Sequence, residues 1–464
     1  MSEQPGVADP ARPTSGTPPE DQVVLDKAVL DDDAVLDDAV LDDDVLDDDV
    51  PGDAVAEPSP VARRVYDPRG WPWWVQVLAV YAAARLFSAI VLMLTASRQE
   101  ASYWGDAHPS YLEFTGKWWD ADWYRQVAEN GYPSQLPRGD DGLVQQNPWA
   151  FFPLFPMMVR GLMTVTGGEY YQVAPLLALV LGAGAMLVIH PLVRIGAPRA
   201  VAARPGLPLA SVALVSVFPT AVVLQIGYTE SLALLLIAAS LLLLLKRLYL
   251  EAALVVIALG FTRAVALPMA VVIVVHALVR WRESRAGRDT LTGRDVGALG
   301  GLAVAAGISG VAWPLICGWV TGEKDGYLLT QEAWRGVRSV KPFSSWGYVT
   351  QFWFGDLAPW VMWGSFALVV AVLVVPAAWR LGPELHVWPA AYLLYIAGAV
   401  EPSSSLARFM LLAFPMATIT AGVVTRPAVA RRAWFTLVVV AMLYLQCVWI
   451  WDMWRIQGPT GWPP

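Results

Sequence analysis

The sequence has very few residues of the types that build disulfide frameworks or metal sites. It contains 2 cysteines and 4 histidines among 464 residues. Cys317 and Cys447 both fall in or near apolar stretches, where a cysteine usually acts as a small buried apolar residue. No histidine or cysteine has the spacing to further ligands that a zinc site requires. The sequence therefore predicts no disulfide framework and no zinc site, and we expect no cofactor.

Charged residues are scarce as well. Only 16% of the chain is charged and 56% is hydrophobic, with a mean hydropathy of +0.47. A soluble domain has about 25% charged residues. The apolar residues are arranged in long runs, each about as long as a helix that crosses a bilayer. The composition predicts an all-α, polytopic protein of the cell membrane, whose partner is the lipid bilayer and not a nucleic acid.

The N-terminal segment differs from the rest of the chain. Residues 1–60 carry 18 Asp and Glu but two Lys and Arg, and a Val-Leu-Asp-Asp unit recurs through residues 29–49. So many charges leave too little apolar area to offset the entropy lost on folding. We expect residues 1–62 to form a disordered acidic tail, with docking to a basic partner as the alternative. Residues 63–464 are then the membrane domain.

Basic residues give the predicted topology, because Lys and Arg collect on the cytoplasmic side of a membrane. Arg63, Arg64 and Arg69 precede the first apolar run, so we expect a cytoplasmic N-terminus. The later basic clusters also become cytoplasmic if residues 151–165 enter the membrane without crossing it. The large first loop, about 96–150, and a later loop, about 321–357, are then extracytoplasmic. The eleven predicted spans are about 73–95, 172–193, 207–226, 230–246, 250–263, 264–280, 296–320, 358–380, 386–400, 406–425 and 433–451.

The first outer loop contains a stretch in which aromatic and acidic residues alternate. Its pattern predicts a short amphipathic helix over residues 118–130. Trp119, Trp123 and Val127 are spaced at i, i+4 and i+8, which places them on one apolar face. We expect this helix to lie along the membrane surface with its tryptophan face in lipid.

Asp120 and Tyr124 lie on a neighbouring face of the same predicted helix. A carboxylate at the membrane surface can take the proton of a hydroxyl group while a new bond forms to its oxygen. Asp120 is therefore a candidate catalytic base, and a solvated acid of a loop is the alternative. Asp120 and Asp122 also form an Asp-x-Asp pair, which can hold a divalent cation on a diphosphate.

A proline-rich aromatic segment follows at residues 147–156. Pro148, Pro153 and Pro156 disfavour one continuous helix there. The segment is either an irregular entry into a span or an aromatic platform for a lipid or a sugar. Phe152 is our candidate contact in the second case.

Four ionisable residues fall inside or at the ends of predicted spans: Arg85, Glu230, Arg263 and Arg408. A charge at membrane depth is costly unless it is paired, so each is a candidate functional residue. The topology places the last three toward the outer face, on the side of Asp120. Two arginines there could hold a lipid phosphate by forked hydrogen bonds. A structural ion pair between Glu230 and Arg263 is the alternative.

Together these stretches resemble the signature of the PIG-V mannosyltransferases, which belong to the GT-C superfamily of multispanning glycosyltransferases. The resemblance extends over roughly residues 70–455. The matching residues are Trp119, Asp120, Ala121, Tyr124, Ala128, Gly131, Tyr132, the segment 151–156, Tyr228, Thr229, Glu230, Ser231, Thr262, Arg263, Arg408, Phe409, Phe414 and Pro415.

The resemblance implies a GT-C-like fold and an inverting transfer of a sugar, usually mannose, from a polyprenyl-phosphate donor on the outer face. It assigns the catalytic acid to the position of Asp120, and the donor pocket to the positions of Glu230, Arg263 and Arg408. A lipid-phosphate donor has no diphosphate for a metal to bridge, which disfavours the metal hypothesis. We expect a cell-envelope acceptor: a glycolipid, a glycan or a protein. Trp119, Asp122, Tyr124 and Phe152 complete the candidate substrate-binding residues.

Two other classes of protein fit parts of the pattern. A transporter or lipid flippase also has many spans, but it commonly shows internal repeats, and the sequence shows no such repeat. A non-catalytic partner subunit of another glycosyltransferase would share the fold.

Overall fold

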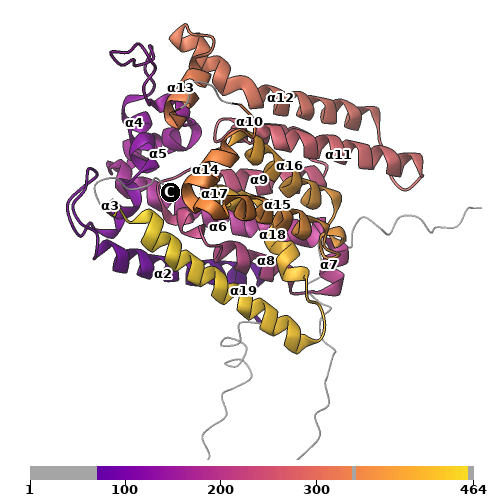
Figure 1. The fold of residues 1–464 in the computed structure, drawn as a ribbon. Coiled ribbons are helices and arrows are strands. Elements are labelled where there is room, and N and C mark those ends of the chain that lie inside the picture. Colours follow the sequence, from indigo (N-terminus) through magenta and orange to yellow (C-terminus); the bar gives the residue numbers. More distant parts are fainter. Residues whose placement is uncertain (1–69, 337–340, 458–464) are drawn as a thin grey trace, which may run out of the picture. The chain divides into compact units, whose positions relative to one another are not determined.

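The computed structural model describes residues 70–336 and 341–457, which belong to the second of two compact units, Pro60–Pro464. The predicted acidic tail lies outside the described residues. Within them the regular structure is helical, and the only extended pairing is two isolated bridges, Ser102 with Gly105 and Arg138 with Val144 (Figure 1). The prediction of an all-α protein is confirmed.

The longer helices are α2 (Trp73–Ala96), α4 (Asp120–Asn130), α5 (Leu154–Thr166), α6 (Tyr170–Gly196), α8 (Leu207–Ser216), α9 (Glu230–Leu245), α10 (Tyr249–Gly260), α11 (Ala266–Arg285), α12 (Gly293–Thr321), α13 (Gly326–Arg335), α14 (Ser345–Phe354), α15 (Ala358–Val374), α16 (Pro383–Ala399) and α19 (Ala428–Trp449). The shorter ones are α3 (Tyr111–Gly116), η2 (Pro148–Ala150), α7 (Pro198–Ala203), η3 (Ala221–Gln225), η4 (Gly355–Leu357), η5 (Ala378–Arg380), α17 (Leu406–Phe409), η6 (Met410–Ala413), α18 (Pro415–Gly422) and η7 (Ile450–Trp454).

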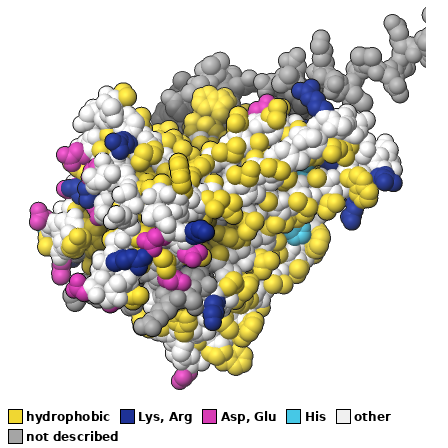
Figure 2. Space-filling model, turned by 90° about the horizontal axis from the view of Figure 1, so that it is seen from above, with side chains coloured by type: hydrophobic (Ala, Val, Ile, Leu, Met, Phe, Trp, Pro, Cys, Tyr) yellow, Lys and Arg dark blue, Asp and Glu magenta, His cyan; other side chains and the backbone are white. Residues whose placement is uncertain are grey.

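The described residues are those of a membrane protein. Five helical segments are long and apolar enough to cross a bilayer: Trp73–Ala96, Tyr170–Gly196, Gly293–Thr321, Ser345–Arg380 and Ala428–Trp454. Large apolar side chains stay exposed on them, such as Trp360, which is 79% exposed on α15. Hydrophobic side chains cover much of the visible face in Figure 2, as expected for a lipid-facing surface. The count of eleven crossings stays a prediction.

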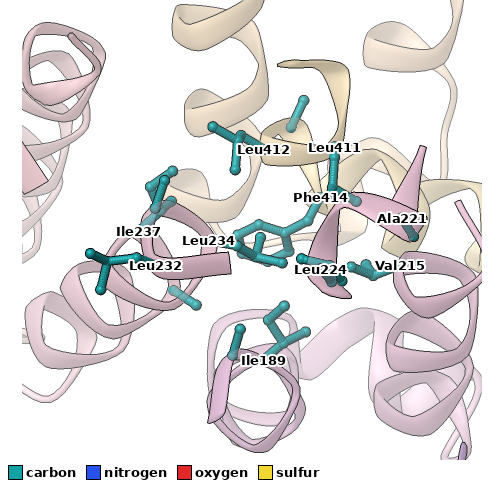
Figure 3. Close-up of a cluster of buried hydrophobic side chains, with 14 of the residues drawn as sticks. Ile189, Val215, Ala221, Leu224, Leu232, Leu234, Ile237, Leu411, Leu412 and Phe414 are labelled. Atoms are coloured by element: carbon teal, nitrogen blue, oxygen red, sulfur yellow. The ribbon is translucent and has the colours of Figure 1, made fainter. Parts of the chain in front are cut away.

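Two of the predicted spans are broken in the structure. The run 207–226 forms α8 and then η3, and the run 406–425 forms α17, η6 and α18. Irregular backbone at membrane depth is tolerated where protein buries it. Here the core of α6, α8 and α9 does so: Figure 3 shows Phe414, which follows η6, close to Leu234 of α9.

Arg85 forms hydrogen bonds to the backbone of the break between α8 and η3. Its guanidinium is buried and donates to two main-chain carbonyls, those of Ala221 and of Ser216, the latter at 2.6 Å. These carbonyls lie where α8 ends and η3 begins. Arg85 therefore satisfies backbone groups that the break would leave without a partner.

The helix of the first outer loop differs from its prediction in its start and in its surroundings. It begins at Asp120, because Trp119 has a φ of 59°, a conformation that costs energy for a residue with a side chain. Trp119 and Val127 are buried, and the Trp119 indole donates to the Trp454 carbonyl at 3.0 Å. The expectation that this apolar face lies in lipid was wrong, because other parts of the chain, η7 among them, cover it.

Gly116 sets the distance between α3 and α6, and so supports the segment that leads into α4. A Cβ atom at Gly116 would lie 2.5 Å from the Cα and carbonyl oxygen of Tyr171. Gly116→Ala is expected to lower the free energy of unfolding by about 1–3 kcal/mol, because backbone has to move. Thermal unfolding of the purified protein in detergent measures this. Gly105→Ala is the control, since a Cβ there has no neighbour within 4 Å; equal unfolding temperatures for both variants would contradict the prediction.

Candidate active site

A cavity of about 1090 Å³ lies where the two predicted outer loops meet the ends of the membrane helices. Asp120 lines it from the start of α4, and Arg263 from the turn between α10 and α11. Arg408 of α17 lines it next to Phe409. The other walls include residues 150–152, parts of α12, α13, α14 and α16, and the segment 398–405. Residues that are far apart in sequence thus surround one space.

Four of the predicted site residues form a continuous chain of ion pairs at this cavity. Arg408 contacts Asp120 through Nη2, and Glu230 Oε1 through Nη1 at 3.0 Å. Arg263 Nη1 lies 2.8 Å from the same Glu230 oxygen. The order is Asp120, Arg408, Glu230, Arg263, so that each carboxylate neighbours an arginine. The predicted ion pair between Glu230 and Arg263 is present as part of this larger arrangement.

The exposure of these side chains changes along the chain of ion pairs. The Glu230 side chain is fully buried and that of Arg408 is 6% exposed, whereas the side chains of Asp120 and Arg263 are each 15% exposed. Two negative and two positive charges leave no net charge in this buried place. Such neutrality is needed, because an unpaired charge there would keep its full desolvation cost. The two end residues can reach a molecule in the cavity.

The four charged residues lie at helix starts or at interruptions of the helices. Asp120 and Glu230 are the first residues of α4 and α9, where the helix dipole favours a negative charge. The Asp120 main-chain N–H donates to the Tyr228 hydroxyl at 3.2 Å, which links the starts of the two helices. Arg263 lies beyond the end of α10 and Arg408 in the short helix α17. At both places the regular helix is interrupted, and this lets polar groups enter the helical core.

Aromatic rings complete the surroundings of the charged groups. The guanidinium of Arg263 lies over the ring of Phe409 at 4.5 Å, and that of Arg408 over Tyr228 at 4.9 Å. The Tyr124 hydroxyl is 3.1 Å from Thr229 Oγ1. Burial raises the pKa of Tyr124 to about 12, so its hydroxyl stays protonated at neutral pH. Tyr124 can therefore act as a neutral hydrogen-bonding group at the cavity wall.

The structure brings together most of the predicted site residues. Asp120, Tyr124, Phe152, Arg263 and Arg408 line the cavity, and Glu230 lies directly behind its wall. Phe152 follows η2, so the proline-rich segment is irregular as expected. α5 begins only after Pro153, and Pro156 occupies its first turn, where a missing N–H is tolerated.

Two predicted residues lie elsewhere. Trp119 is buried beside the segment around Trp454. Asp122 lies on another side of α4, where it bonds to Arg125 and Gln126 and lines a separate depression of about 400 Å³. The two carboxylates of the Asp-x-Asp pair therefore do not face one site. In residues 70–336 and 341–457 no group of three or more Asp, Glu, His or Cys side chains is arranged to hold a metal ion.

The sequence did not identify the contributions of α13 and α16. Trp334 and Arg335 of α13 line the cavity, as do Tyr392 and Tyr395 of α16. The predicted topology placed residues 321–357 in an outer loop. Nothing in its spacing, however, indicated which of its residues reach the cavity.

No protein-family model matches the sequence, and no curated protein matches it. Three solved structures of an oligosaccharyltransferase from Archaeoglobus fulgidus are similar to the chain, each at 13% sequence identity. The AglB protein in complex with an inhibitory peptide and a dolichol-phosphate has a TM-score of 0.44 over 84% of this chain. The enzyme tethered to an acceptor peptide with the NVT sequon has a TM-score of 0.45 over 83%, and a complex with zinc and sulfate 0.43 over 82%. The matches cover 57%, 56% and 54% of those chains. The resemblance to the PIG-V family stays a prediction.

Proposed function

We propose that the protein is a membrane glycosyltransferase that moves a sugar, mannose, from a polyprenyl-phosphate donor to a cell-envelope acceptor on the outer face. The observation that carries this proposal is the position of Asp120. It is an acid at a cavity wall, at the end of a buried and electrically neutral chain of ion pairs. The acceptor is a hydroxyl-bearing glycolipid, glycan or protein.

In the proposed reaction the acceptor oxygen attacks the anomeric carbon of the sugar. The bond from that carbon to the phosphate oxygen breaks, and its electron pair goes to the departing lipid phosphate. The hydroxyl proton goes to a carboxylate oxygen of Asp120, which acts as general base. Attack from the face opposite the phosphate inverts the anomeric configuration.

The chain of ion pairs links the two charge changes of this reaction. Before transfer the four side chains carry no net charge. When Asp120 takes up the proton, the group that remains (Arg408, Glu230 and Arg263) has one positive charge in excess. The departing phosphate gains one negative charge in the same step. The positive charge released at Arg408 therefore appears when the leaving group needs it, which stabilises the transition state.

The size and lining of the cavity also support the proposal. Its volume of about 1090 Å³ is slightly above the range of about 300–1,000 Å³ that ligand pockets commonly show. It can hold a sugar phosphate and part of an acceptor at once. Phe151 and Phe152 give apolar surface for the sugar or the lipid, and Arg263 gives hydrogen-bond donors for phosphate oxygens.

A transfer assay tests the proposed function. Purified protein in lipid vesicles is expected to move radiolabelled mannose from polyprenyl-phosphate mannose to components of a cell-envelope extract. Nucleoside-diphosphate mannose in place of the lipid donor is expected to give no product, since the cavity has no carboxylate cluster for a metal-bridged diphosphate among the described residues. Absence of transfer from any polyprenyl-phosphate sugar would overturn the proposal. Direct use of the nucleotide sugar would overturn the donor class.

A further inference from the structure

We infer that Arg335 binds the phosphate group of the donor and that it determines donor affinity. This inference rests on the proposed function and assigns a residue of the second outer loop to it. Among residues 70–336 and 341–457, five charged side chains line the cavity: Asp120, Arg263, Arg335, Glu401 and Arg408. Their partners show which positive charge is available to a ligand.

Arg263 and Arg408 are already engaged by carboxylates. Both contact the buried oxygen of Glu230, and Arg408 also contacts Asp120. A phosphate that approaches them before the reaction has to compete with these pairs. In contrast, no carboxylate oxygen of the described residues lies within 4.0 Å of the Arg335 guanidinium. Its one hydrogen bond within the described residues joins Nη2 to the Ala399 carbonyl at 2.7 Å.

The single bond of Arg335 leaves most of its hydrogen-bonding capacity for a ligand. A guanidinium has five N–H donors in a planar fork that matches the oxygens of a phosphate. The Arg335 side chain is neither fully buried nor fully exposed, and it lines the cavity. The bond to Ala399 fixes one nitrogen to the end of α16. The other nitrogens bond to none of the described residues and can contact an anion in the cavity.

The helix that carries Arg335 is held firmly against the first outer loop. Thr330 Oγ1 accepts a hydrogen bond from Asn147 Nδ2 at 3.1 Å, and the Trp334 indole donates to the Asn147 carbonyl at 3.3 Å. The Trp334 ring also contacts Trp123 of α4, with ring centroids 5.0 Å apart. α13 is thereby fixed to the same loop that carries Asp120. Arg335 is a preorganised contact and not a side chain on a free loop.

The charges predict how Arg335 acts. A polyprenyl-phosphate sugar is a phosphodiester with one negative charge, and the four paired side chains are neutral toward it. Of the other two described charged side chains at the cavity, Glu401 accepts a hydrogen bond from the Tyr348 hydroxyl at 3.3 Å, and Arg335 is the positive charge that the bound donor meets before any proton moves. Its loss should therefore raise the donor KM and weaken binding of the product, polyprenyl phosphate. The effect on kcat should be smaller, because Asp120 and Arg408 remain in place.

Binding of polyprenyl phosphate without turnover tests the inference. We compare the wild type with Arg335→Gln, Arg335→Lys and the control Arg138→Gln, in which an outer-loop arginine loses its pair with Glu323 away from the cavity. Arg335→Gln is expected to bind about tenfold more weakly, Arg335→Lys to recover most of the affinity and Arg138→Gln to match the wild type. Polyprenol, which has no phosphate, should bind equally to all four proteins. An affinity of Arg335→Gln within about twofold of the wild type overturns the inference.

A measurement on the wild type keeps the test independent of how the variants fold. Phenylglyoxal modifies accessible arginines, and peptide mass spectrometry reports the extent at each one. Polyprenyl phosphate should protect Arg335 and not Arg138, and polyprenol should protect neither; unchanged labelling of Arg335 overturns the inference. If the wild type transfers sugar while Arg335 stays unprotected, the inference alone fails. If the wild type neither transfers sugar nor prefers polyprenyl phosphate to polyprenol, the proposed function fails with it.

Discussion

Asp120→Asn is expected to lower the rate of sugar transfer by about 100- to 10,000-fold, the usual contribution of a general base. Asparagine has nearly the same shape and can still accept a hydrogen bond from Arg408, but it cannot take up the hydroxyl proton. Because asparagine is neutral, Arg408, Glu230 and Arg263 carry their excess positive charge before the reaction as well, so that charge no longer appears only as the leaving group forms. The measurement is the initial rate in lipid vesicles with radiolabelled polyprenyl-phosphate mannose.

Two controls separate chemistry from folding and binding in this experiment. Asp106→Asn makes the same change at an exposed position of the same loop that does not line the cavity, and it should keep the wild-type rate. Binding of polyprenyl phosphate to Asp120→Asn should be at least as tight as in the wild type, because Arg335 and Arg263 are unchanged and Arg408 no longer has the Asp120 carboxylate as a partner. Full transfer by a well-folded Asp120→Asn protein would refute the catalytic role. It would favour a non-catalytic partner subunit if the activity follows a co-purifying enzyme.

Arg408→Gln is expected to produce the largest loss of stability, about 3–5 kcal/mol, because it removes the central cation of a buried chain of charges. Glu230 is fully buried and would keep only Arg263, and Asp120 would lose its partner. The remaining three residues would carry one net negative charge in the core. Thermal unfolding followed by tryptophan fluorescence measures the effect.

A double variant distinguishes charge imbalance from lost packing. Arg408→Gln together with Glu230→Gln removes one charge of each sign, so the site returns to neutrality. It should therefore recover about 2 kcal/mol or more of the loss, although transfer remains abolished. Arg138→Gln, which breaks a partly exposed pair with Glu323, should cost about 0–1 kcal/mol. Stability losses that simply add in the double variant would contradict the importance of charge balance.

The charged part of the site could be predicted from sequence because membrane topology limits where charges can lie. Glu230, Arg263 and Arg408 were each placed at the outer side of a predicted span, and the structure brings them to Asp120. Asp122 could have been separated from Asp120 by helix geometry alone. Two residues along a helix turn the side chain by about 200°. The Asp-x-Asp pair suggested a shared site for Asp120 and Asp122, whereas the helical repeat already showed that their side chains point in different directions.

Other features depend on tertiary contacts that the sequence does not encode locally. An apolar face spaced at i, i+4 and i+8 shows that Trp119 and Val127 avoid water, but it does not distinguish lipid from protein as their environment. Arg335 lies in no apolar pattern and no recognised motif. Its role follows only from the lack of a carboxylate partner among the described residues and from the bonds that hold α13 to Asn147. The breaks after α8 and α17 likewise depend on the core that covers them.

The bond between the Trp119 indole and the Trp454 carbonyl determines when the site can form during synthesis. Gln99 adds a second link to the same segment, since its side chain accepts from the Ile456 main-chain N–H at 3.0 Å. A membrane protein is made and inserted from its N-terminal end, so the loop with Asp120 emerges more than 300 residues before its support. The nascent chain therefore lacks this support for the segment of its proposed catalytic acid until η7 is in place. Ribosome-bound intermediates that stop before residue 450 should be inserted but inactive.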